Sequence, residues 1–229
     1  MDNIIIAIDG FASTGKSSLA KAIAKHLNYI YVDSGSMYRA ITYYVINNNL
    51  IPLSKANLSE LNNKLLKISL NFIYNEKLGY SEIYLNNKLI EKEIRSVLIS
   101  KHVSSVAALP FVRRQMVNLQ KKISLNKGVV MDGRDIGTVV FPDAELKLFL
   151  SASAEIRAKR RYDEYVKNNI NISYDEVLSD LQSRDLDDST RKDSPLMIAS
   201  DAIEIDNSEM SINDQLNYVI SILSEKFNL

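Results

Sequence analysis

The segment Gly10–Ser17 constrains the fold of this chain most, because it reads Gly-Phe-Ala-Ser-Thr-Gly-Lys-Ser. An apolar run at residues 4–8 precedes it, and apolar residues at helical spacing follow from Leu19 to Leu27. A strand, a glycine-containing loop and a helix in this order are what a phosphate-binding loop requires, since backbone N–H groups and the helix N-terminus then face one anion. The segment therefore predicts a nucleoside triphosphate site in an α/β fold.

Individual residues of this loop have distinct expected roles. Gly10 and Gly15 let the backbone turn around a polyanion. Lys16 is expected to reach the outer phosphates, and the Ser17 hydroxyl to take a position on Mg²⁺. The other loop residues expected to bind the nucleotide are Ser13, Thr14 and Ser18. ATP and Mg²⁺ are thus the expected cofactors.

Composition excludes several other classes of protein. The chain has 229 residues, 46% of them hydrophobic, which suits a single unit over 1–229 with at most a small appended part. Its 28 Lys and Arg balance 28 Asp and Glu, so no overall field attracts nucleic acid or an anionic membrane. No cysteine is present and no apolar segment approaches membrane-spanning length. We expect a cytoplasmic protein whose partners are small molecules.

Short apolar runs that alternate with helical patterns predict the architecture. This alternation is typical of a parallel sheet flanked by helices, here a five-stranded, three-layer P-loop fold. Helix starts are expected at Ser173, in a capping box with Glu176, and at Ser211. The five runs are residues 4–8, 29–32, 129–131, 146–150 and 202–205.

One region departs from this alternation. Residues 68–74 and 81–90 have the composition of strands, are joined through polar residues 75–79, and contain a second turn signal at Asn86-Asn87. They predict a small antiparallel insert over about residues 64–103.

Arginine and aspartate side chains cluster after the predicted strands. Asp33–Arg39 follows the second run and Asp132–Gly137 the third, where ligands of such sheets gather. Arginine binds phosphate oxygens in pairs, and phosphoryl transfer depends mainly on alignment and charge neutralisation. A third cluster on the helix after Ser173 consists of Arg184, Asp185, Asp188 and Arg191. The three clusters favour a phosphotransferase with a second substrate.

A nucleotide-dependent switch or motor ATPase is the alternative from another class. The chain lacks the Asn-Lys-x-Asp guanine signature, and Gly133 follows Asp132 where ATPases that activate water usually have Glu. A phosphotransferase acting on UMP, AMP, dTMP or a metabolite alcohol is the alternative within the same class.

The loop Gly10–Ser17, the segment Asp33–Arg39 and the long run Asp132–Ala144 together resemble the bacterial-type cytidylate kinases, which are P-loop nucleoside monophosphate kinases. The resemblance covers nearly the whole chain. It implies transfer of the γ-phosphoryl group of MgATP to CMP or dCMP in pyrimidine nucleotide metabolism. It also implies a monomer, an insert that enlarges the monophosphate-binding lobe, and a helical lid at 157–172.

The resemblance implies which residues bind the acceptor nucleotide. Arg39 and Arg134 would hold the CMP phosphate with Ser34, and Arg184 and Asp188 would approach the sugar. The full implied set is Ser34, Tyr38, Arg39, Ser104, Arg113, Arg134, Asp135, Arg184 and Asp188.

Cytosine recognition would fall to Ser104, Arg113 and Asp135. An ionised Asp135 only accepts hydrogen bonds, and cytosine presents an amino donor where uracil presents an oxygen. UMP should therefore be a poor substrate, because a buried acceptor facing an acceptor goes unpaired.

The implied residues at the transferring group are Lys16, Arg134, Arg157, Arg161 and Arg191. Closure of a lid that carries Arg157, Arg160 and Arg161 would bring positive charge over the phosphoryl group and expel water. Asn207 falls where the family places adenine.

Some of these residues have structural alternatives. Arg160 and Arg161 could instead form a solvated helix face, and Asp33 could cap the next helix. Asp132 either organises Mg²⁺ through water or bonds loop amides, and both alternatives are open.

Three positions depart from the family pattern. Asp187 stands where many relatives have arginine, and Phe11 and Ser18 differ from the commonest loop residues. We expect altered rates rather than lost activity.

Overall fold

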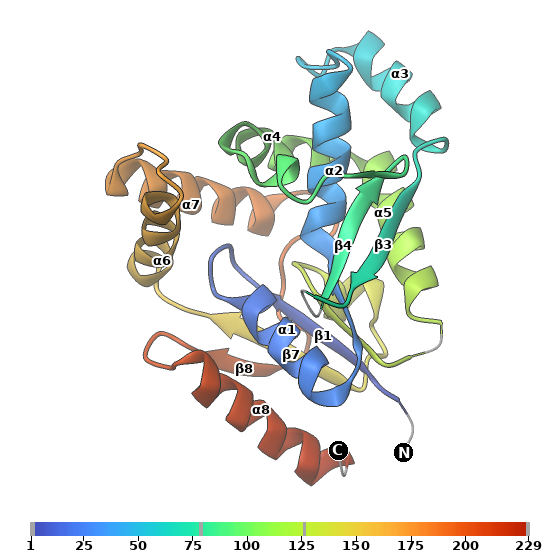
Figure 1. The fold of residues 1–229 in the computed structure, drawn as a ribbon. Coiled ribbons are helices and arrows are strands. Elements are labelled where there is room, and N and C mark those ends of the chain that lie inside the picture. The colour runs from blue at the N-terminus through green and yellow to red at the C-terminus, as the bar shows by residue number, and fades with distance from the viewer. Residues whose placement is uncertain (1–2, 78–79, 126, 228–229) are drawn as a thin grey trace. The chain divides into compact units, whose positions relative to one another are not determined.

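A computed structural model describes residues 3–77, 80–125 and 127–227 (Figure 1). The chain forms two compact units, one of Met1–Tyr29 with Lys127–Leu229 and one of Ile30–Asn126. The insert predicted at 64–103 lies in the second unit, and the lid predicted at 157–172 lies in the first.

The main sheet has five strands in the order β2-β6-β1-β7-β8, as the apolar runs predict. Strand β1 pairs in parallel with β6 and β7, and β7 pairs in parallel with β8. The strands are β1 (Ile5–Gly10), β2 (Ile30–Asp33), β6 (Val129–Asp132), β7 (Leu146–Ser151) and β8 (Ile203–Asp206). Each ends one or two residues beyond its predicted run, because backbone pairing continues into the polar residues that follow.

Four α-helices belong to the first unit: α1 (Lys16–Leu27), α6 (Ala154–Lys167), α7 (Tyr174–Thr190) and α8 (Ile212–Phe227). The stripe predicted for α1 is buried, and α8 packs along α1 (Figure 1). The capping box of Ser173 and Glu176 begins α7 as predicted. Ser211 exchanges hydrogen bonds with Asp214 at the start of α8, so the second predicted helix start is confirmed too.

Helices α6 and α7 lie side by side and share an apolar seam with the phosphate loop. The seam consists of Ala12, Ala158, Val177 and Leu181, all buried. A short π-helical turn, η2 (Ile136–Val140), follows β6.

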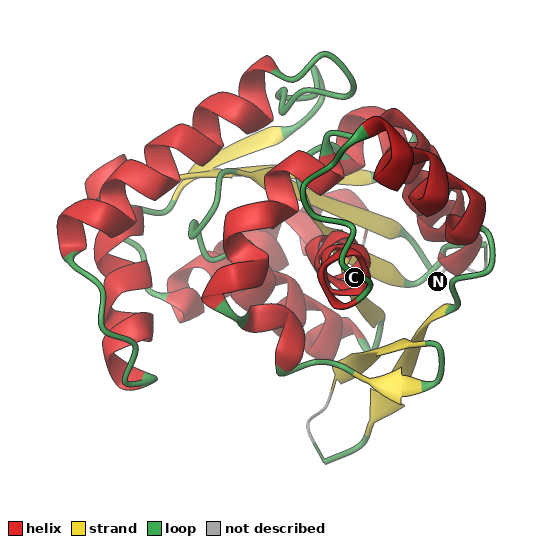
Figure 2. Cartoon of the chain, turned by 90° about the horizontal axis from the view of Figure 1, so that it is seen from above, coloured by secondary structure: helices red, strands yellow, loops and turns green. Residues whose placement is uncertain are grey.

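The second unit contains the predicted antiparallel insert, whose strands appear at the lower right of Figure 2. Its strands are β3 (Leu70–Asn75), β4 (Tyr80–Leu85) and β5 (Lys88–Leu89). The turn predicted at Asn86-Asn87 is present, with φ of 48° and 67°, and it divides the single strand expected at 81–90. Leu78 and Gly79, in the predicted connection, lie outside the described residues.

The helices of this unit are α2 (Ser34–Asn47), α3 (Lys55–Leu65), α4 (Val97–Ala107) and α5 (Pro110–Ile123), with a 3₁₀ turn η1 (Glu93–Arg95). These helices and one face of the insert sheet enclose a hydrophobic core that belongs to the second unit. Its fully buried side chains include Ile41, Leu61, Ile83, Ile94 and Val106.

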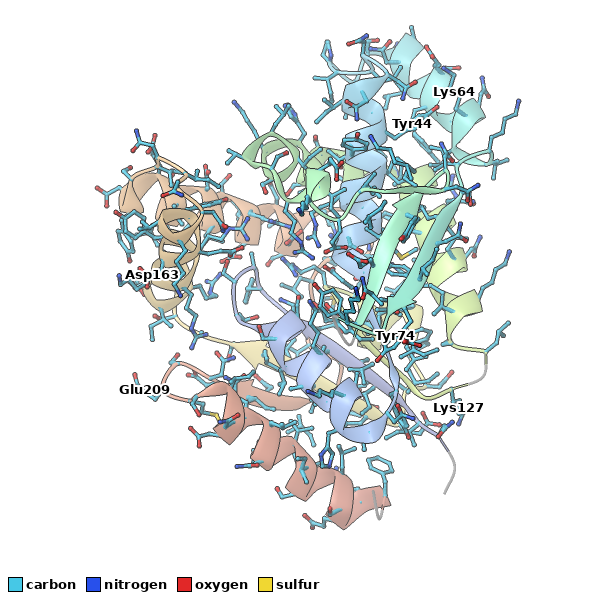
Figure 3. All side chains as sticks on the ribbon, in the orientation of Figure 1. Tyr44, Lys64, Tyr74, Lys127, Asp163 and Glu209 are labelled. Atoms are coloured by element: carbon cyan, nitrogen blue, oxygen red, sulfur yellow. The ribbon has the colours of Figure 1, made fainter. Side chains whose placement is uncertain are left out.

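The outer faces of the helices carry ion pairs one helical turn apart. Lys64 lies 2.6 Å from Glu60 on α3, and Lys159 lies 2.7 Å from Asp163 on α6 (Figure 3). Water screens exposed pairs of this kind, so they contribute little to stability. Over the described ranges, no helix combines the length and the apolar character needed to cross a membrane.

Candidate active site

The phosphate loop joins β1 to α1 and has the backbone that its glycines predict. Gly10 has φ of +143°, and a Cβ there would lie 2.1 Å from the carbonyl oxygen of Leu150. Gly15 has φ of +89° and precedes the first residue of α1. The buried Oγ of Ser13 has no hydrogen-bond partner among the residues that the structure describes. The loop thus offers a polar atom and a helix N-terminus to an anion, which fits a triphosphate.

Lys16 is buried in this loop, with 5% of its surface exposed. Its Nζ donates to the Phe11 carbonyl and, at 3.2 Å, to Thr14 Oγ1. Burial and then the charge of Arg134 lower the pKa of Lys16 well below its ordinary value, although Asp132 and Asp9 oppose them. Because the ammonium group is short of negative charge, a phosphate next to it would stabilise its charged form.

Ser17 and Asp132 meet at the ends of the loop and of β6. Ser17 Oγ donates to Asp132 Oδ2 at 2.9 Å. Across the residues that the structure describes, no group of three or more acidic or histidine side chains could hold a metal ion by itself. Hydroxyl and carboxylate oxygens suit Mg²⁺, which takes few protein ligands and fills its coordination with phosphate and water. The donor set therefore fits Mg²⁺ bound together with a triphosphate.

Arg134 and Arg191 converge on Asp188, which is buried on α7. Arg134 Nε donates to one carboxylate oxygen at 2.8 Å, and Arg191 Nη1 donates to the other at 3.4 Å. Burial alone would raise the pKa of Asp188, but Arg134, Arg184 and Arg191 outweigh it and lower that pKa. Asp188 thus stays ionised and orients two of the predicted arginines. Its predicted contact with the sugar stays a prediction.

Arg191 also lies 3.9 Å from Asp135, the predicted reader of cytosine. Asp135 is 4% exposed and immediately precedes η2. The structure therefore brings Lys16, Arg134, Asp135, Arg184, Asp188 and Arg191 into one charged cluster of the first unit.

Arg157, predicted as a lid arginine, is instead held inside the first unit. Its Nη1 donates to Asp185 Oδ2 at 2.6 Å and to the Ala12 carbonyl at 3.3 Å. Its guanidinium lies 5.3 Å from the centre of the Phe11 ring. Phe11, one of the departures from the family pattern, thus contacts this guanidinium and makes a T-shaped ring contact with Phe149.

The two neighbouring arginines of α6 differ from each other. Arg160 donates to Asn207 Oδ1 at 3.0 Å and to the Asn207 carbonyl at 2.8 Å, so it is not simply part of a solvated face. Asn207 donates in turn to the Thr14 carbonyl at 2.6 Å and to Gln215 at 2.9 Å. Arg161 lies over the ring of Tyr165. Asn207 is therefore a fixed support of the phosphate loop, and its predicted contact with adenine stays a prediction.

In the second unit, Asp33 caps α2, as the structural alternative for this residue predicts. It also pairs with Arg39, which is predicted to bind the CMP phosphate. Its Oδ1 accepts the Ser36 N–H at 2.9 Å, and its Oδ2 lies 2.5 Å from Arg39 Nη2. A Cβ on Gly35 would lie 3.1 Å from both Arg39 Nη1 and Asp33 Oδ1, so glycine leaves room for the pair. Within the described part of the chain, the buried Nε of Arg39 has no hydrogen-bond partner.

The other predicted acceptor residues of this unit lie on its helices. Ser34 and Tyr38 are on α2, and the half-buried Ser104 is on α4. Arg113 of α5 is 2% exposed, lies over the Tyr38 ring at 5.4 Å and donates to the Ala107 carbonyl at 3.2 Å.

Comparison with known proteins identifies the family. Residues 6–225 match the family model described as Cytidylate kinase. The chain is 55% identical over 224 residues to the cytidylate kinase of Flavobacterium psychrophilum, covering 98% of this chain and 99% of that protein. This chain belongs to the cytidylate kinase family. It is thus a nucleoside monophosphate kinase, a phosphotransferase.

Other relatives of the family agree. The cytidylate kinase of Flavobacterium johnsoniae is 50% identical over 225 residues, with 98% of each chain covered. A shikimate kinase from Bacteroides thetaiotaomicron has the same fold at 13% identity, with a TM-score of 0.51 and 99% of each chain covered.

Two carboxylates of this kinase were not predicted as site residues. Asp185 was noted in the third cluster without a role, and it holds Arg157. Asp9 accepts two backbone N–H groups of η2. The signal for Asp9 is its position, since it is an acidic residue at the end of a strand that is otherwise apolar and buried.

Proposed function

We propose that this member of the cytidylate kinase family transfers the γ-phosphoryl group of ATP to CMP or dCMP, with Mg²⁺, giving ADP and CDP or dCDP. We also propose that it acts as a cytoplasmic monomer in pyrimidine nucleotide metabolism.

The crowding of cations around Lys16 carries this proposal. Burial lowers the pKa of Lys16 most, and the charges of Arg134 and Arg184 lower it further. Buried like charges are expensive unless an anion joins them. The γ-phosphoryl group is such an anion, and its charge spreads over three oxygens during transfer.

The loop residues bind the donor nucleotide. Backbone N–H groups between Ser13 and Ser18 surround the phosphates, Lys16 neutralises the outer ones, and Asn207 and Arg160 hold the loop in shape. Ser17 would hold Mg²⁺, and Asp132 would hold it through water if it contributes. The ion would supply positive charge that neutralises the transferring phosphoryl group.

The residues assigned to the acceptor nucleotide have separate roles. Arg39 with Ser34 and Arg134 take its phosphate, Ser104 and Arg113 contact the base with Tyr38 alongside, and Arg184 and Asp188 approach the sugar. Asp135 accepts the amino group of cytosine and thereby disfavours uracil.

At the transferring group, Arg134 and Arg191 stabilise the transition-state charge and Arg161 adds charge from the lid. Arg157 acts by supporting the loop through the Ala12 carbonyl.

Product identification tests the proposal. The enzyme is mixed with Mg²⁺, CMP and ATP labelled at the γ-phosphate, and labelled products are separated by anion exchange. Label in CDP is expected, with loss of at least about a hundredfold in the rate for Lys16→Ala. Label in inorganic phosphate, at a rate that CMP does not change, would instead indicate an ATPase.

A further inference from the structure

Asp9 is a buried carboxylate between the phosphate loop and the turn that carries Arg134 and Asp135. It is the penultimate residue of β1, directly before Gly10, and 5% of its surface is exposed. Its Oδ1 accepts the N–H of Ile136 at 2.8 Å, and its Oδ2 accepts the N–H of Gly137 at 2.7 Å.

These two bonds fix the turn at a specific point. Ile136 and Gly137 directly follow Asp135, so a carboxylate that binds both of their amides restricts the backbone on which Asp135 stands. The other end of the turn is fixed by the Gly133 N–H, which donates to the Ile8 carbonyl at 2.9 Å. Arg134 and Asp135 are therefore the two residues between these attachments to β1.

Gly137 is part of the same arrangement. A Cβ there would lie 3.4 Å from Asp9 Oδ2 and 3.2 Å from the Lys147 side chain. Both contacts are tight, so glycine at position 137 lets the Asp9 carboxylate approach the Gly137 N–H group. Lys147 itself is directed elsewhere, since its Nζ bonds Asp201 at 2.8 Å.

The carboxylate is costly to keep at this position. Burial and the charge of Asp135 raise the pKa of Asp9 to about 6, against the two amides and Lys16. The preceding strand residues Ala7 and Ile8 are apolar and fully buried. A strand needs no carboxylate there for packing, so a role in the site is the simpler explanation.

We propose that Asp9 is a positioning residue that fixes the turn Asp135–Gly137, so that Arg134 and Asp135 are presented together to the acceptor nucleotide. The inference rests on the proposed CMP kinase activity. It assigns to Asp9 an effect on acceptor binding and base selection, distinct from any effect on ATP through Lys16.

The test compares Asp9→Asn and Asp9→Ala with a matched control. Glu145→Gln is the control because the Glu145 carboxylate also accepts a backbone N–H of β1, that of Ile5 at 2.9 Å, at the opposite end of the strand. KM and kcat are measured for CMP, UMP and ATP, with circular dichroism to verify folding.

We expect Asp9→Asn to raise KM for CMP roughly tenfold, which corresponds to about 1.4 kcal/mol, and to reduce the preference for CMP over UMP, since a charge-assisted hydrogen bond to the turn is lost. KM for ATP should change little. Asp9→Ala should do more, because the carbonyl of Asn still accepts one amide. Glu145→Gln should leave all constants near the wild-type values.

An unchanged KM for CMP in folded Asp9→Ala, or an equal rise in KM for ATP, would overturn the proposal. Should Asp9 variants fail to fold, Gly137→Ala crowds the same contact and must raise KM for CMP selectively. Wild-type activity separates the two claims. If the wild type does not phosphorylate CMP, the proposed function fails and the inference fails with it. If the wild type does so but the Asp9 variants do not change KM for CMP selectively, only the positioning role of Asp9 is refuted.

Discussion

Asp185 Oδ2 lies 2.6 Å from Arg157 Nη1, and both side chains are largely buried, with 15% and 6% of their surfaces exposed. The pair joins α7 to α6, and Arg157 extends the connection to the phosphate loop through the Ala12 carbonyl. The phosphate loop is therefore supported from α6, which overlaps the predicted lid, and from α7.

Removing Asp185 should destabilise the protein strongly. Asp185→Ala leaves the Arg157 charge buried without its partner, which typically costs about 3–5 kcal/mol. Asp163→Ala is the control, because it removes an exposed carboxylate that pairs with Lys159 on α6, where water screens the pair. Urea unfolding measures the free energy of unfolding of both variants. Equal losses of stability would contradict a structural role for the buried pair of Asp185 and Arg157.

Gly10 and Gly15 should differ in their tolerance of alanine. Both have positive φ, but only at Gly10 would a Cβ meet backbone, 2.1 Å from Leu150 O; at Gly15 the nearest atom is Asn207 Nδ2 at 3.8 Å. Gly10→Ala should therefore lower the melting temperature by far more than Gly15→Ala, whose cost is about 1–2 kcal/mol of backbone strain. Equal melting temperatures would show that β1 and β7 can separate to admit the methyl group.

Ionisation of Asp9 should make stability depend on pH. The pKa of Asp9 is raised from 3.8 to about 6, so between these values the folded protein keeps a proton that the unfolded chain has released. The contribution of Asp9 to stability then falls as pH rises through that window. Since one pKa unit corresponds to about 1.4 kcal/mol, the fall is at most about 3 kcal/mol.

Asp9→Asn isolates this effect from other titrating groups. The unfolding free energy of wild type minus that of Asp9→Asn, measured at several values between pH 4 and 8, should decrease as pH rises and become constant above about pH 7. A difference that increases with pH would mean that the folded state favours the ionised carboxylate.

Asp33 should affect acceptor binding more than stability. Asp33→Asn keeps a good helix N-cap for α2 but weakens the ion pair that orients Arg39. We expect KM for CMP to rise several-fold while the melting temperature changes little, since the cap is retained. Thermal unfolding measures the change in stability, and initial rates measure the change in KM for CMP. Asp33→Ala should lower both the affinity for CMP and the stability. A large loss of stability in Asp33→Asn would instead assign the carboxylate a purely structural role.

Local sequence signals predicted the elements of the fold well. Strands β1, β6 and β7 were recognisable as apolar runs because they are buried on both faces, and Gly10 and Gly15 marked a loop with positive φ at both positions. The polar ends of the strands were not predicted, because backbone pairing extends to Asp9, Asp33 and Asp132 after the apolar run has ended.

The partners of individual charges could not be predicted. Asp9 bonds residues more than 120 positions away, and spacing does not specify which carboxylate an arginine meets. Three acidic residues near the end of α7 have different surroundings: Asp185 pairs with Arg157, Asp188 pairs with Arg134, and Asp187 is exposed. The surroundings of each carboxylate follow from the face of the helix on which it lies. The exposed position of Asp187 also means that this departure from the family pattern removes no buried cation.

Initial rates of ADP release with MgATP and each of CMP, dCMP, UMP, AMP and dTMP test the central claim most directly. Fast release confined to CMP and dCMP is predicted, with kcat/KM at least about a hundredfold above that for UMP, because an acceptor facing an acceptor is left unpaired. Comparable rates with UMP would contradict base selection by Asp135. Release that does not require any acceptor would contradict phosphoryl transfer to a nucleotide altogether.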